Sequence, residues 1–147
     1  CKDSNARVVF FASGGINNPV VNLSAYTIGK IMLIKMCEFL DAENKDLNIS
    51  IIGPGWTKTK THNLILENVD KDDPRYGQTK EFMDKESGTS MEDIFQCIEW
   101  VRNQEKETAS GRNFSVNHDS WKSGDELSLS LKNDPDMFKL RRSEGRK

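Results

Sequence analysis

The stretch Leu47-Asn-Ile-Ser-Ile-Ile52, followed by Gly53-Pro54-Gly55, is an apolar run rich in isoleucine that stops at a turn. Such a run is typical of a strand buried inside a parallel sheet, and the Pro-Gly pair marks its end. A second apolar run, Arg7-Val-Val-Phe-Phe-Ala12, lies upstream and ends in Ser13-Gly14-Gly15. Two buried strands separated by a helical pattern predict an α/β protein with a parallel sheet.

The segment between these strands repeats apolar side chains every three or four positions, which predicts a long helix over residues 24–43. Ser24 is placed to cap its start. Tyr26 and Lys30 are four residues apart and therefore lie on one face, about one turn from each other. Apolar residues cover more of this helix than one contact with a sheet needs. They are Ile28, Ile31, Met32, Ile34, Met36, Phe39 and Leu40.

The later part of the chain predicts further helices and one more strand. Residues 60–88 are crowded with charge but hold enough apolar side chains for short amphipathic helices, and a helix is expected over about 90–105, with Thr89-x-x-Glu92 as its capping box. Thr108 to Asn117 is expected to be the last strand, entered through a turn. After residue 120 the chain becomes more polar, with apolar side chains that predict packing against the rest.

The order of these features resembles the short-chain dehydrogenase/reductase family. Its catalytic half runs from a strand and a serine, through about a dozen residues, to Tyr-x-x-x-Lys on a helix, and then to a strand ending in Pro-Gly. Ser13, Tyr26 and Lys30 match this order, and Pro54 to Thr59 matches the family's Pro-Gly-x-x-x-Thr segment. The resemblance covers about residues 7–119.

The resemblance implies the C-terminal part of a doubly wound, Rossmann-type sheet. The family's Gly-rich dinucleotide turn does not occur in this sequence, so we expect the cofactor-binding βαβ units to precede residue 1 and activity to require them. Residues 1–119 would be the catalytic half, with residues 60–88 as the substrate-binding lid, and 120–147 a polar C-terminal extension.

The implied chemistry is hydride transfer between a nicotinamide and a secondary alcohol or carbonyl, which also requires a proton to move. An unperturbed tyrosine titrates near ~10, and a nearby ammonium favours the phenolate. We therefore assign Tyr26 as the general acid/base and Lys30 as its electrostatic partner. Ser13 would bind the substrate oxygen, as preorganised donors do at developing negative charge.

The cofactor contacts follow from the resemblance alone. The bound molecule would be NAD or NADP, with Lys30 at the nicotinamide ribose beside Tyr26. Pro54 and Gly55 would turn the backbone past the nicotinamide, Thr57 would offer main-chain contacts, and Thr59 a hydroxyl to the carboxamide or pyrophosphate. Two alternatives remain: a non-catalytic relative that keeps the fold as a nucleotide-binding or scaffold module, and an inactive truncated fragment.

Composition excludes several other classes of function. The 147 residues carry a net charge of −2 with interspersed signs, which gives no field for nucleic acid or an anionic membrane. The three cysteines, Cys1, Cys37 and Cys97, are odd in number and far apart, so a reducing cytoplasm is expected. No metal site is expected, because His118 and Asp119 lack a second ligand at metal spacing and predict a turn instead.

Two features leave a functional and a plain interpretation open. His62 follows Thr59 by three residues, where it could face substrate or simply be solvated. Trp56 could line the pocket or pack as a buried aromatic. The family commonly pairs the helix that carries the Tyr and Lys with its symmetry mate, which implies a homodimer or homotetramer. Ile34 is expected on the side of that helix away from Tyr26 and Lys30.

Overall fold

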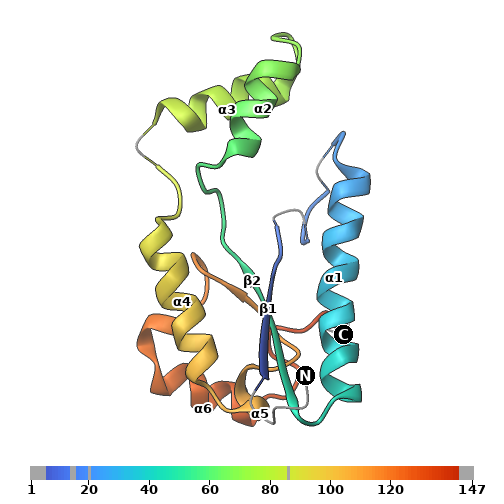
Figure 1. Ribbon diagram of the computed structural model, residues 1–147, viewed down its shortest axis with the longest axis vertical. Helices are drawn as coiled ribbons and strands as arrows, with labels where there is room; N and C mark the ends of the chain where they lie inside the picture. Colours follow the sequence, from blue (N-terminus) through green and yellow to red (C-terminus); the bar gives the residue numbers. More distant parts are fainter. Residues whose placement is uncertain (1–5, 14–15, 20, 86, 143–147) are drawn as a thin grey trace, which may run out of the picture.

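The computed structural model describes residues 6–13, 16–19, 21–85 and 87–142, and its centre is a three-stranded parallel sheet (Figure 1). The strands are β1 (Ala6–Phe11), β2 (Leu47–Gly53) and β3 (Asn113–Ser115), and they lie in the order β1-β2-β3. Both pairs are parallel, β1 with β2 and β2 with β3. The predicted α/β class with a parallel sheet is therefore confirmed.

Helices connect and cover these strands. Within the described residues they are α1 (Ser24–Glu43), α2 (Lys60–Asn68), α3 (Pro74–Asp84), α4 (Met91–Asn103), α5 (Lys106–Ala109), the 3-10 helix η1 (Trp121–Ser123) and α6 (Asp125–Asn133). Figure 1 shows α1 on one side of the sheet and α4 with α6 on the other, while α2 and α3 extend beyond it. The long helix over 24–43, the short helices expected within residues 60–88 and the helix near 90–105 are confirmed.

The core has two parts because successive side chains of β2 point to opposite faces. Ile49 and Ile51 face α1, where they pack with Ile34 and Cys37. Ile52 faces the other way, into a cluster built by α4, β3 and the C-terminal helices. The buried members of that cluster are Ile52, Ile94, Cys97, Val101, Ala109, Phe114, Val116, Trp121, Leu127 and Leu131.

The side of α1 that faces the sheet differs from the expectation. Ile34 is 4% exposed and packs against β2, so its expected place on an interface was wrong. The exposed apolar stripe consists instead of Ile28, Met32, Met36 and Phe39. Ile34 also follows Lys30 by four residues, so it lies on the same face of α1 as Tyr26 and Lys30, and the expectation that it lay on the other side was wrong.

Both predicted helix caps were placed one residue away from the real ones. Ser24 is the first residue of α1, and the cap position belongs to Leu23, whose side chain makes no capping hydrogen bond. At α4 the cap is Ser90, whose hydroxyl accepts a 2.9 Å hydrogen bond from the Asp93 N–H. The Thr89 hydroxyl has another partner, Asn117, which sequence spacing could not reveal.

The last strand is shorter than expected. Thr108 and Ala109 belong to α5, and β3 comprises only residues 113–115. The chain beyond residue 120 packs into the same core, because Trp121, Leu127 and Leu131 are buried there. Its end then crosses to the other face of the sheet, where Leu140 packs against the α1 cluster.

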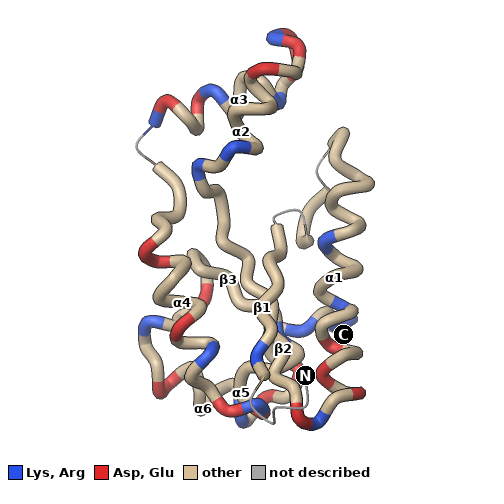
Figure 2. Tube along the Cα trace, in the orientation of Figure 1, with Lys and Arg blue, Asp and Glu red and all other residues tan. Residues whose placement is uncertain are grey.

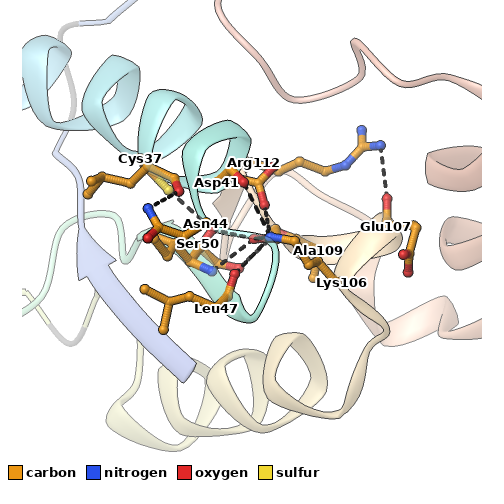
Figure 3. A network of polar contacts seen from close by, with 12 residues as sticks. Cys37, Asp41, Asn44, Leu47, Ser50, Lys106, Glu107, Ala109 and Arg112 are labelled. Atoms are coloured by element: carbon orange, nitrogen blue, oxygen red, sulfur yellow. Dashed lines mark hydrogen bonds and ion pairs between the residues drawn. The ribbon is translucent and has the colours of Figure 1, made fainter. Parts of the chain in front are cut away.

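Polar contacts tie the helices to the sheet at its amino edge, away from the carboxyl ends of the strands (Figure 3). The Lys106 ammonium of α5 pairs with Asp41 of α1 and donates to the Leu47 carbonyl at 2.8 Å. Arg112 is 2% exposed, and its guanidinium donates to the carbonyls of Leu131 at 2.7 Å and Met137 at 2.6 Å. These bonds offset the cost of burying the guanidinium and hold the C-terminal segment against the core.

Charges of both signs are interspersed over the helices (Figure 2). Among the described residues, no helix combines the length and apolarity that crossing a membrane would require.

Candidate functional site

The candidate site lies at the carboxyl edge of the sheet, where β1 and β2 end side by side. Phe11 pairs with Ile52, and the N–H of the next residue, Ala12, donates to the Ile52 carbonyl at 2.8 Å. Helix α1 runs back from this edge, so its first two turns lie there (Figure 1). In open α/β sheets, ligands bind outside the carboxyl ends of the strands.

Tyr26 and Lys30 occupy these first turns of α1. The Lys30 ammonium donates to the Phe11 carbonyl at 2.8 Å, which joins the helix to the end of β1. The same ammonium lies 5.8 Å from the centroid of the Tyr26 ring, within the range of a cation–π contact. Tyr26 is 55% exposed, so its phenol is open to a ligand from solvent.

Ser13 is partly buried and follows β1 by two residues. The Lys30 bond to Phe11 therefore brings the ammonium to the end of the strand that leads to Ser13. The three predicted catalytic residues come from the same edge of the sheet. Gly14 and Gly15, which follow Ser13 in the sequence, lie outside the described residues.

The Pro54–Gly55 turn continues β2 at this edge. Gly55 has a φ of +75°, a conformation that side chains disfavour. A Cβ at Gly55 would also overlap the Asn117 amide and lie 2.6 Å from the Thr89 hydroxyl oxygen. Both backbone conformation and close packing therefore require glycine here.

Thr57 is buried just after the turn, with 9% of its surface exposed. Its hydroxyl oxygen has no hydrogen-bond partner in the described part of the chain. An unpaired buried hydroxyl is costly and is found mainly where a ligand or water completes it. Sequence reasoning assigned only main-chain contacts to Thr57, because burial of its side chain could not be read from spacing.

Thr59 stands at the cap position of α2, where His62 occupies its polar groups. The Thr59 backbone N–H donates to His62 Nδ1 at 3.3 Å, and the hydroxyl lies 3.2 Å from the same nitrogen. A contact between the Thr59 hydroxyl and a cofactor would have to compete with this pairing. His62 is thus half-buried and bonded, in contrast to the solvated alternative.

An aromatic cluster joins the turn to α2 and α3. The Trp56 ring packs edge-on against Phe82 of α3, with centroids 4.9 Å apart, and lies 5.8 Å from the His62 ring. Lys58 adds a second link, donating to the carbonyls of Met83 at 2.9 Å and Lys85 at 2.6 Å at the end of α3. Trp56 is still 52% exposed, so it is neither a fully buried aromatic nor a free one.

Three other titratable residues, Asp119, Cys37 and Cys97, contribute to turns or to the core and lie outside the candidate site. Asp119 accepts a 2.6 Å hydrogen bond from the Ser115 N–H, which confirms the turn expected at the end of the last strand. Burial raises the pKa of Asp119. Cys37 and Cys97 are buried in the two core clusters, and this burial raises the pKa of each thiol to about 12. Cys1 lies outside the described residues, among which no cluster of three His, Cys, Asp or Glu could hold a metal.

Comparisons of this chain with protein-family models, curated proteins and solved structures find no match. Its function must therefore be argued from the site itself.

Proposed function

We propose that this chain carries the proton-transfer machinery of a nicotinamide-dependent oxidoreductase of the short-chain type, acting on a secondary alcohol or carbonyl. The observation that supports this most is the position of the Lys30 ammonium. It donates to the Phe11 carbonyl at 2.8 Å and lies 5.8 Å from the Tyr26 ring centroid. A phenol and a fixed cation thus stand together at the carboxyl edge of a parallel sheet.

NAD or NADP, when bound, supplies hydride to the substrate carbon or takes it up. In reduction the Tyr26 hydroxyl gives its proton to the carbonyl oxygen, and in oxidation the Tyr26 phenolate takes the alcohol proton. The Lys30 ammonium lies beside the Tyr26 ring, where its positive charge would stabilise negative charge that develops during proton transfer. The Ser13 hydroxyl donates to the substrate oxygen and stabilises negative charge as it develops there.

The residues at the turn fit a nicotinamide. The unpaired hydroxyl of Thr57 can donate to or accept from a carboxamide, and Lys30 would hold the ribose beside Tyr26. The described sheet is compatible with part of a Rossmann-type fold.

The exposed stripe of α1 supports self-association into a homodimer or homotetramer. Ile28 is 55% exposed, Met32 65% and Phe39 61%. A two-fold axis would bring the same stripe of two copies together, since such an interface is self-complementary. This stripe is on the side of α1 opposite Ile34, so an interface there leaves the packing of α1 on the sheet intact.

The proposal is tested by replacing Tyr26 with phenylalanine in the protein that carries this sequence. Tyr26→Phe keeps the ring but removes the transferable proton, so turnover with NADH or NADPH and a panel of ketones should fall about 10²-fold or more. Cofactor affinity, measured by calorimetry, should stay unchanged. Ser130→Ala, which removes an exposed hydroxyl on α6, is the control and should keep wild-type turnover.

Lys30→Ala should weaken both turnover and cofactor binding, because Lys30 serves both. Wild-type turnover in Tyr26→Phe would contradict the assignment. Nicotinamide binding by the wild type without turnover of any ketone or alcohol would favour the non-catalytic alternative.

A further inference from the structure

The two ends of the lid (residues 60–88) meet at a narrow base. The chain leaves the Pro54–Gly55 turn through Trp56 and returns at Thr89, whose N–H donates to the Trp56 carbonyl at 2.7 Å. Beyond this point α2 and α3 extend away from the sheet (Figure 1). The orientation of the lid therefore depends on how firmly this base is held.

A third segment reaches the base from the turn after β3. The Asn117 side-chain amide donates to the Thr89 hydroxyl at 2.8 Å. Thr89 is buried, while Asn117 is exposed. Both side chains also pack closely against Gly55, since a Cβ there would overlap the Asn117 amide and lie 2.6 Å from the Thr89 hydroxyl oxygen.

We propose that Asn117 is a positioning residue that, through Thr89, fixes the Pro54–Gly55 turn and the base of the lid in a single arrangement. One amide thus couples the backbone expected to face the cofactor to the segment expected to cover the substrate. Sequence spacing gave no sign of this role, because Asn117 lies 28 residues from Thr89.

This role differs from ordinary stabilisation. Asn117 is exposed, so water can satisfy its amide when the bond to Thr89 is lost, and the free energy of unfolding should fall by only about 1 kcal/mol. The loss instead frees the turn and the lid to move relative to each other. The kinetic part of this inference rests on the proposed function, whereas the effect on lid motion does not.

The test compares Thr89→Val with Thr89→Ser, using hydrogen–deuterium exchange read by mass spectrometry. Valine keeps the shape of threonine but removes the acceptor of the Asn117 bond, whereas serine keeps the hydroxyl. Exchange in α2, α3 and the amide of residue 89 should rise about fivefold in Thr89→Val, the factor for losing one ordinary hydrogen bond. Thr89→Ser should match the wild type.

Asn117→Ala tests the other partner and should reproduce the exchange of Thr89→Val. Asn103→Ala, at an exposed asparagine at the end of α4, is its matched control and should leave exchange in the lid unchanged. In turnover assays, Asn117→Ala should raise KM for substrate about fivefold, while kcat stays within about twofold of the wild-type value at each pH.

Unchanged lid exchange in both Thr89→Val and Asn117→Ala would overturn the inference, as would an equal rise in Thr89→Ser. Increased exchange with an unchanged KM would overturn the coupling to substrate. If turnover proves independent of Tyr26, the proposed function fails, but the exchange results still decide whether Asn117 holds the base of the lid.

Discussion

Replacing Gly55 with alanine should destabilise the chain through two separate effects. The first is backbone strain, because φ is +75° at this position and a left-handed conformation costs a residue with a Cβ about 1–2 kcal/mol. The second is the collision of the new Cβ with the Asn117 amide and with the Thr89 oxygen, 2.6 Å away. Asn117 is exposed and can swing aside, at the cost of its hydrogen bond to Thr89, about 1 kcal/mol.

The sum is a loss of about 2–3 kcal/mol in the free energy of unfolding. Urea unfolding followed by circular dichroism measures it as a shift of the midpoint at unchanged slope. Gly29→Ala is the control, because nothing lies within 4 Å of a Cβ there and the site is inside α1. That change should stabilise the chain by about 1 kcal/mol.

A double substitution separates the two effects. In Gly55→Ala with Asn117→Ala, the collision with the amide is gone while the strain of φ remains. The loss should therefore be about 1 kcal/mol smaller than the sum of the two single losses, the coupling expected of residues in contact. Wild-type stability of Gly55→Ala, or strict additivity in the double variant, would refute the account of this turn.

Three further outcomes are expected. Thr57→Val should leave the free energy of unfolding unchanged or raise it by up to about 1 kcal/mol, because the buried Thr57 hydroxyl is unpaired. Calorimetry should also show weaker nicotinamide binding by this variant. A clear loss of stability would mean that the hydroxyl has a partner. The Arg141 guanidinium, by hydrogen bonding, lowers the pKa of Glu38 to about 2. This stabilisation is complete above about pH 4.5, the pKa of the carboxyl in the unfolded chain, and is lost as pH falls toward 2. Arg141→Ala should therefore lower the free energy of unfolding, measured by urea titration, by about 1 kcal/mol at neutral pH and by progressively less between these limits. A pH-independent difference would contradict the pairing. Met32→Asp should shift the protein toward monomer in size-exclusion chromatography with light scattering, and a wild type that is already monomeric would exclude the α1 interface.

The extent of α1 and the order of strands and helices could be predicted, because they depend on local apolar periodicity and on turn residues. The sheet-facing side of α1 could not, since Ile34 and Met32 are equally apolar and only contact with Ile49 and Ile51 distinguishes them. A helix with one apolar stripe would have left no such choice.

In the candidate site, too, local spacing could be predicted from the sequence and contacts between distant segments could not. The Tyr26–Lys30 pairing follows from helical spacing, but the bond from Lys30 to the Phe11 carbonyl depends on how α1 lies against β1. The cap of α4 is Ser90 and not the expected Thr89, whose hydroxyl accepts a hydrogen bond from Asn117 in another part of the chain. Long-range partners of this kind leave no periodic signal in a sequence.

The proposed hydride transfer is tested most directly by following isotope from cofactor to product. The protein is incubated with NADH or NADPH deuterated at nicotinamide C4 and a panel of ketones, and the alcohols are examined by mass spectrometry. We expect deuterium at the carbinol carbon with the wild type and about 10²-fold slower transfer with Tyr26→Phe. Absence of deuterated alcohol with every ketone, or equal transfer by both proteins, would contradict the account.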